Sequence, residues 1–296
     1  MAIQNTIALI FDCDDTLCPD TISFLLEHYG VSPKRFWRAV TRMVRTGWDS
    51  PLAYMQRIID LVNRGKMPDL TNAKLEEIGA QLEFFPGIPQ FFQDLHGIVR
   101  AQKFAEADVS LEFYVVTGGF EAMVRGSIVA PHLTDIFGCT FYEDPKTHLI
   151  CYPKTTVTFT EKTKFLFAIQ KGIKGAELRR DPYRVNDAMS EEEKQIPFRN
   201  MIYIGDGPSD IPCFSLIQAF GGDGGNRTGH AIGVYKLGVR KGYELARGRR
   251  ITAGPYSCDY SPRSDLRQFI ESSITEIASE IVRLRSLTFR RAVRQP

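Results

Sequence analysis

The chain has 296 residues, of which 43% are hydrophobic and 24% charged, and its 37 Lys and Arg against 35 Asp and Glu give a formal net charge of +2. Such a length and composition are ordinary for a globular protein of about two domains. The nearly neutral charge gives no indication of a nucleic-acid or membrane partner. The 6 cysteines include no CxxC pair, which argues against a structural zinc site or a disulfide framework.

The apolar run near the N-terminus, Ile7 to Phe11, is far shorter than the ~20 residues of a membrane helix. No basic segment precedes it and acidic residues follow it, which is not typical of a secretory signal peptide. We therefore expect a cytoplasmic protein whose thiols are reduced.

The first predicted element is a strand over 6–11, apolar on both faces as in a buried parallel strand. The following segment has apolar residues at helical spacing and no strand pattern. We interpret residues 19–86 as a small all-helical domain inserted after this strand, with Trp37 and Trp48 in its core. Residues 1–18 and 87–296 then form the main domain.

Further buried strands are predicted at 111–117, 201–205 and 231–235. Helices are predicted over 162–171 and over the apolar repeat 266–284, and a hairpin or short strands over 140–160. The charged segment 174–200 is interpreted as a solvated excursion, and the glycine run 221–225 as a loop. Strands that alternate with helices predict an α/β fold with a parallel sheet flanked by helices.

Polar side chains follow the ends of these strands. The candidates are Asp12, Asp14, Thr117, Asp206 and Asp210. Because ligands bind beyond the carboxyl ends of parallel strands, we expect these side chains to converge at one edge of the sheet. Two charges at 4 Å repel by about 4 kcal/mol at an effective dielectric near 20, and a divalent cation removes that repulsion. Oxygen ligands favour Mg²⁺, which suits a phosphate ester as substrate.

The same residues resemble the motifs of the haloacid dehalogenase-like (HAD) phosphohydrolases. Asp12-Cys13-Asp14-Asp15-Thr16 is similar to the first motif, DxDx[TV], and Thr117 to the second. Gly205-Asp206-Gly207-Pro208-Ser209-Asp210 is similar to the fourth, GDGxxD. Lys162 is assigned as the lysine of the third motif, with Lys164 and Lys154 as competitors. The resemblance spans residues 6–236, and the helical insertion resembles the C1-type cap of the phosphoserine-phosphatase-like branch.

This resemblance implies a HAD-like Rossmannoid core with an inserted helical cap, and a mechanism. Asp12 would attack phosphorus to form an aspartyl-phosphate, and Asp14 would act as general acid and then general base. The residues implied for the Mg²⁺ site are Asp12, Asp14 through its backbone carbonyl, Asp206 and Asp210, the last as ligand or orienting group. The residues implied for phosphate binding are Thr117, Gly118 and Lys162.

The predicted function is a Mg²⁺-dependent phosphatase that acts on a small phosphorylated metabolite, without a nucleic-acid or membrane partner. A phosphomutase of the same fold shares these carboxylates, and a non-catalytic HAD-like binding protein is the third hypothesis. Asp14 disfavours a dehalogenase, because dehalogenases that resemble this chain lack the second aspartate. A simpler explanation also exists for several aspartates: Asp14 and Asp15 as caps of a turn or helix, Asp206 as a turn residue and Asp210 as a helix-start residue. Asp20 lies one residue short of the acidic residue with which phosphoserine-specific relatives read the substrate amine.

Overall fold

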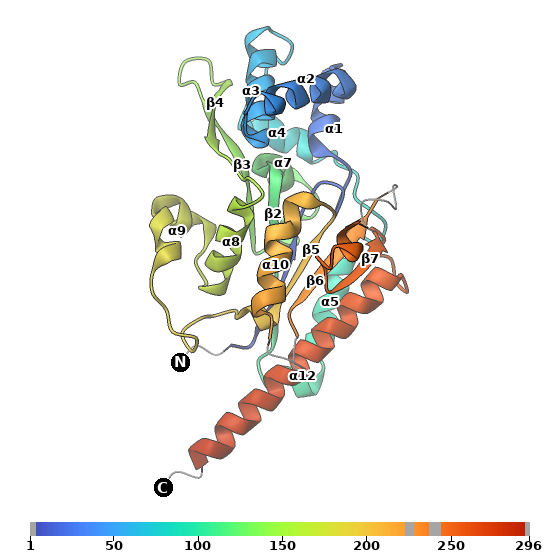
Figure 1. Cartoon of the computed structure of the whole chain (residues 1–296), viewed down its shortest axis with the longest axis vertical. Helices are drawn as coiled ribbons and strands as arrows, with labels where there is room; N and C mark the ends of the chain where they lie inside the picture. The colour runs from blue at the N-terminus through green and yellow to red at the C-terminus, as the bar shows by residue number, and fades with distance from the viewer. Residues whose placement is uncertain (1–3, 223–227, 237–243, 294–296) are drawn as a thin grey trace.

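The computed structural model describes residues 4–222, 228–236 and 244–293. Its strands form a 7-stranded sheet in the order β4-β3-β2-β1-β5-β6-β7 (Figure 1). The strands are β1 (Thr6–Phe11), β2 (Ser110–Phe120), β3 (Asp135–Glu143), β4 (Ile150–Thr155), β5 (Met201–Gly205), β6 (His230–Tyr235) and β7 (Ala253–Ser257). Neighbouring strands run parallel, except for the antiparallel pair β3–β4.

Helices connect these strands and cover the sheet. They are α1 (Thr21–His28), α2 (Pro33–Arg45), α3 (Ser50–Asn63), α4 (Asn72–Gly79), α5 (Gln90–Val99), α6 (Gln102–Ala105), α7 (Glu121–Gly126), α8 (Glu161–Gln170), α9 (Gly175–Arg180), α10 (Ile211–Phe220) and α12 (Asp265–Val293). Short 3₁₀ helices lie at Ala130–His132, Pro182–Asn186, Phe198–Asn200 and Pro208–Asp210. The predicted α/β fold with a parallel sheet is confirmed.

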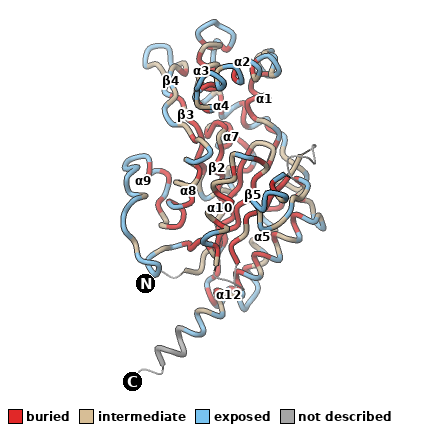
Figure 2. Tube along the Cα trace, viewed as in Figure 1, coloured by how far each residue is buried: buried red, intermediate tan, exposed pale blue. Residues whose placement is uncertain are grey.

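Strand β1 occupies the centre of the sheet, where Phe11 pairs with Val115 of β2 and with Ile204 of β5. Its side chains alternate between two cores, one on each face of the sheet: Ile7, Leu9 and Phe11 in one, Ala8 and Ile10 in the other. Figure 2 shows this central sheet as the buried part of the molecule. The carboxyl ends of β1, β2 and β5 therefore lie side by side.

Helices α1 to α4 lie together at one end of the molecule (Figure 1), and residues 19–86, all described, contain no strand. Ile58 and Leu75 of this layer belong to the same buried cluster as Phe120 at the end of β2 and Met123 of α7. The apolar core thus continues from the helical layer into the α/β part. That 19–86 forms a separate domain stays a prediction.

The helical layer contacts the rest of the chain most closely where α4 crosses α7. A Cβ on Gly79 would lie 2.1 Å from the Met123 carbonyl oxygen, and one on Gly126 would lie 1.9 Å from the Glu76 carbonyl oxygen. Only glycine fits at either position, because a side chain would need the two backbones to separate. The α4–α7 contact thus fixes how the helical layer sits over the sheet.

The structure differs from the sequence predictions in several elements. Segment 174–200 contains α9 with Leu178 buried, so it is only partly a solvated excursion. Strand β7 was not predicted, because its glycine and proline are typical of turns. Trp48 is 43% exposed, so its prediction as a core residue is wrong. The glycine run 221–225 lies largely outside the described residues.

Candidate active site

A buried lysine lies between two aspartates beneath the carboxyl edge of the sheet. The Lys162 Nζ is 2.9 Å from Asp12 Oδ2 and 2.7 Å from Asp210 Oδ1, and its side chain is 2% exposed. Asp12 directly follows β1, Asp210 precedes α10, and Lys162 belongs to the first turn of α8. The parallel sheet therefore brings together residues that are remote in sequence.

Burial and neighbouring charges shift the pKa values of Asp12 and Lys162. Burial raises the pKa of the Asp12 carboxyl to about 6, although the Lys162 ammonium opposes the shift. Burial lowers the pKa of Lys162, but the two carboxylates outweigh it and hold that pKa above its ordinary value. Lys162 is therefore a cation that offsets the charge of the Asp12 carboxylate beside it.

Asp210 receives hydrogen bonds on both carboxylate oxygens. Lys162 and the Tyr203 hydroxyl donate to Oδ1, the latter at 2.8 Å, and the Gly207 backbone N–H donates to Oδ2 at 3.1 Å. Asp210 is fully buried. These contacts make it an orienting group for Lys162 and for the loop that follows β5.

Asp14 lies in the tight turn after β1, where its neighbour Asp15 has a φ of 54°. The Thr21 backbone N–H donates to Asp14 Oδ1 at 2.7 Å, which fixes the carboxyl at the start of α1. Burial, reinforced by the Asp20 carboxylate, raises the pKa of Asp14 to about 7. A carboxyl group with such a pKa can both donate and accept a proton near neutral pH.

The end of β2 forms the third side of the site. Thr117 is fully buried, and its Oγ1 accepts a hydrogen bond of 2.9 Å from the Gly119 N–H. A Cβ on Gly119 would lie 2.8 Å from Asp14 Oδ2, so glycine at this position lets the end of β2 approach the first motif closely. Gly118 lines the cavity described next.

A cavity of about 310 Å³ opens between the aspartates and the helical layer. Its aromatic side chains come from α2, α3 and the β4–α8 connection: Trp37, Tyr54 and Phe159. The Tyr54 hydroxyl donates to the Gly118 carbonyl oxygen, which joins α3 to the end of β2. Trp37 thus lines the candidate site and also packs against the buried cluster of the helical layer.

Within the described residues, Asp12, Asp206 and Asp210 form a group in which one carboxylate oxygen from each residue lies within 4.8 Å of the other two. Hard oxygen donors of this kind suit Mg²⁺, so the residues present fit that ion. The Asp14 carboxylate lies outside this group. Two other lysines competed with Lys162 for the role of the third-motif lysine. Of these, Lys164 pairs with Glu161 and Lys154 is exposed.

Comparisons with known proteins agree with this geometry. A sequence model described as haloacid dehalogenase-like hydrolase matches residues 9–215, more than half of the chain. The chain belongs to the haloacid dehalogenase-like hydrolases. An uncharacterized protein of Borreliella burgdorferi is 29% identical over 239 residues, which cover 73% of this chain and 79% of that protein.

Solved structures of HAD hydrolases share the fold. A phosphoserine phosphatase with a phospho-aspartyl intermediate analogue aligns with a TM-score of 0.51 and 15% identity, over 90% of this chain and 99% of that one. A probable phosphoserine phosphatase from Vibrio cholerae aligns with a TM-score of 0.52 and 12% identity, over 94% of this chain and 68% of that one. The HAD-like Rossmannoid fold is thereby confirmed.

The HAD motifs account for only part of this site. The structure brings Asp12, Lys162, Asp206 and Asp210 together, with Asp14 and Gly118 on the wall of the same cavity. Sequence reasoning missed the contacts that orient them, namely those of Tyr203, Tyr54 and Gly119. Tyr203 lies within the predicted strand ahead of GDGxxD, and its place there was the available signal.

Proposed function

We propose that this HAD hydrolase is a Mg²⁺-dependent phosphatase that cleaves a small phosphomonoester through an aspartyl-phosphate on Asp12. The observation that carries the proposal is the Asp12 carboxylate beside the Lys162 ammonium at 2.9 Å, at the base of a small cavity with Asp206 on its wall. A carboxylate held against a cation at a cavity floor is suited to attack an anionic phosphoryl group.

Each nearby side chain has a part in this reaction. Asp12 is the nucleophile and Lys162 offsets the negative charge that gathers around the phosphoryl oxygens. Asp14, held by the Thr21 N–H, protonates the leaving alcohol and later takes a proton from the attacking water. Thr117 and Gly118 position the phosphoryl group from the end of β2.

The implied metal would be held by Asp12 and Asp206, with the Asp14 backbone carbonyl, and Asp210 would orient these groups. When bound, Mg²⁺ supplies positive charge that neutralises the phosphoryl oxygens. Asp210 receives hydrogen bonds on both oxygens, which supports an orienting role over direct coordination.

The cavity itself favours a small substrate. At about 310 Å³ it lies at the lower end of the range for small-molecule sites. Asp20 accepts hydrogen bonds from the Ile22 N–H, the Ser23 hydroxyl and the Trp37 indole N–H. Those contacts give Asp20 a structural role as the cap of α1, which speaks against phosphoserine recognition through this residue.

Hydrolysis of an aryl phosphate such as p-nitrophenyl phosphate tests the proposal. We expect turnover with Mg²⁺, its loss with EDTA, and its abolition in Asp12→Asn. A silent binding protein would show no turnover in any condition. Full activity of Asp12→Asn would exclude Asp12 as the nucleophile. A sugar phosphate substrate distinguishes a mutase, which would yield an isomerised ester instead of free phosphate.

The remaining expectations accompany this proposal. We expect the enzyme to work in the cytoplasm on a free phosphorylated metabolite, without a nucleic-acid or membrane partner. Fractionation of cells that produce the tagged chain tests the first, and a screen of phosphorylated metabolites tests the second.

A further inference from the structure

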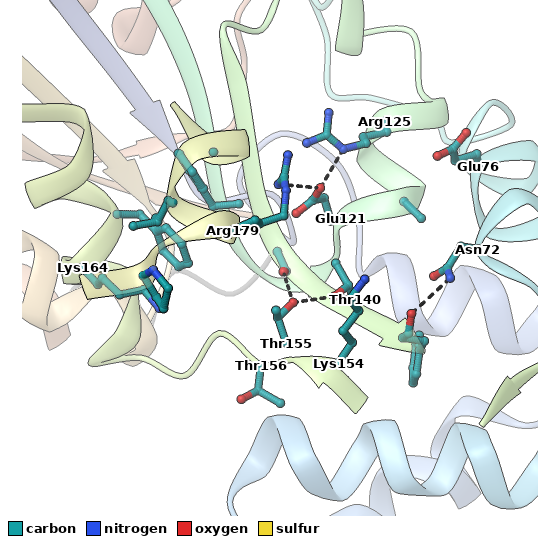
Figure 3. Close-up of a pocket in the computed structure, with 18 residues that line it drawn as sticks. Asn72, Glu76, Glu121, Arg125, Thr140, Lys154, Thr155, Thr156, Lys164 and Arg179 are labelled. Atoms are coloured by element: carbon teal, nitrogen blue, oxygen red, sulfur yellow. Dashed lines mark hydrogen bonds and ion pairs between the residues drawn. The ribbon is translucent and has the colours of Figure 1, made fainter. Parts of the chain in front are cut away.

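A second and larger cavity, of about 710 Å³, lies outside the proposed active site. Figure 3 shows it among α4, α7, the β3–β4 hairpin, α8 and α9. Within the described residues, this cavity and the catalytic cavity share no lining side chain. Its volume falls in the range of about 300 to 1,000 Å³ that is typical of sites for small molecules.

In this cavity, the arginine side chains are more exposed than the carboxylate that they contact. Arg125 Nε is 2.7 Å and Arg179 Nη1 is 3.4 Å from the same oxygen of Glu121, as Figure 3 shows. The Glu121 side chain is 11% exposed, whereas those of Arg125 and Arg179 are 36% and 48% exposed. One buried carboxylate therefore orients two guanidinium groups that remain partly exposed, and Arg125 Nη2 also donates to the Ile136 carbonyl oxygen at 3.5 Å.

Other charges surround this pair. Asp135, behind Arg125, is 3.7 Å from it and 12% exposed. Lys164 pairs with Glu161, and Glu76 lies on the α4 side of the cavity. Lys154 of β4 is exposed and has no ion pair with any residue that the structure describes. Its ammonium and the two guanidinium groups can therefore meet an anion from different walls.

The floor of the cavity is apolar. Phe137 and Phe165 stack with their ring centroids 4.6 Å apart, and Leu178 and Phe141 are buried beside them. We propose that this cleft binds a small organic anion, whose apolar part rests on this floor and whose carboxylate, phosphate or sulfonate head contacts Arg125, Arg179 and Lys154.

A short stretch of chain borders both cavities. Lys154 to Thr156 and then Lys164 and Phe165 line the second cavity, whereas Val157, Phe159 and Lys162 between them line the catalytic one. An anion bound in the second cavity therefore contacts the segment that holds Lys162. We infer an effector site, and this effect on turnover, unlike the binding itself, rests on the proposed phosphatase function.

The test uses the full chain with Mg²⁺ and the probe 8-anilinonaphthalene-1-sulfonate, an aromatic sulfonate that is not a phosphate ester. We expect saturable binding by fluorescence titration and calorimetry. Arg179→Gln and Lys154→Gln, on opposite walls, should each weaken it about tenfold, as expected for one lost charge-assisted contact. Arg180→Gln and Lys146→Gln are matched controls, because both residues are exposed and neither lines the cavity.

Equal affinity in the two cavity variants and the wild type would overturn the site, as would an equal loss in the controls. In kinetic assays the saturating probe should change kcat or KM at least twofold in the wild type. Unchanged kinetics with the probe bound would overturn the effector role. If no variant hydrolyses any ester, the phosphatase proposal fails while the binding titration still decides the site.

Discussion

Lys162 is the residue on which the proposed site depends most for both stability and reactivity. It is a buried cation that forms ion pairs with Asp12 and Asp210. Removing one partner from a buried ion pair is more costly than removing the whole pair, because it leaves uncompensated charge in the interior.

Lys162→Met should therefore lower the free energy of unfolding by about 3 kcal/mol, the range seen for broken buried pairs. Activity should be lost as well. Lys164→Met on the same helix is the control, because its pair with Glu161 is partly exposed and contributes about 0.5 kcal/mol. Urea titration measures both, and a Lys162→Met variant as stable as the wild type would contradict the ion-pair account.

A second residue-level prediction concerns Tyr54. Tyr54→Phe removes the hydroxyl that joins α3 to the Gly118 carbonyl, so it should raise KM several-fold while the fold is kept. Tyr29→Phe, which removes a surface hydrogen bond to Asp69, should leave KM unchanged. Steady-state kinetics with an aryl phosphate distinguishes the two. Equal KM values in both variants would mean that the Tyr54 contact does not position the end of β2.

At the scale of elements, the packing of α4 on α7 ties the helical layer to the sheet. Gly126→Ala places a Cβ where it would meet the Glu76 carbonyl oxygen at 1.9 Å, so it should destabilise the protein by about 1 to 3 kcal/mol through overpacking. Gly97→Ala in α5 has no atom within 4 Å of the new Cβ and should be neutral or stabilising. If Gly126→Ala had the same melting temperature as Gly97→Ala, the helices α4 and α7 would separate at little cost.

Much of the fold could be predicted at this scale, because buried parallel strands are continuous apolar runs and their ends carry the motifs. The strands that directly precede Asp12 and Asp206, and the strand that contains Thr117, are of this kind. Strand β7 and helix α9 were missed, since local composition outweighed the tertiary contacts that order them. Which lysine completes the site could not be derived from spacing, because Lys162 and Lys164 lie on different sides of one helix.

The sequence also did not determine which aromatic side chains of the helical layer would line the cavity. Trp37 belongs to α2 and lines the catalytic cavity, whereas Trp48 lies in the loop between α2 and α3 and is exposed. Helical periodicity identifies an apolar face but not the element that covers it.

In the whole molecule, the parallel sheet brings aspartates that are far apart in the sequence into one acidic cluster. No helix in the described part of the chain has both the length and the apolar character to span a bilayer. Only the folded chain brings Asp12, Asp206 and Asp210 together, and in the proposed function this cluster binds a hard cation. Mg²⁺ should therefore stabilise the native state by mass action.

This gives a prediction that does not require activity. At about a hundredfold excess over Kd, Mg²⁺ should add about 2.7 kcal/mol of stability, and thermal melting should rise accordingly. Asp206→Asn should abolish the rise, whereas Asp108→Asn, an exposed residue remote from the cluster, should retain it. A rise of equal size in Asp206→Asn would place the ion elsewhere.

In the proposed function, Asp12 carries the phosphoryl group during turnover. Rapid acid quenching of the enzyme at work on a saturating aryl phosphate, followed by peptide mass spectrometry, measures this directly. The account predicts one added phosphoryl group on the peptide that contains Asp12, labile to hydroxylamine and absent from Asp12→Asn. A phosphoryl group on any other residue, or steady turnover without a covalent adduct, would contradict it.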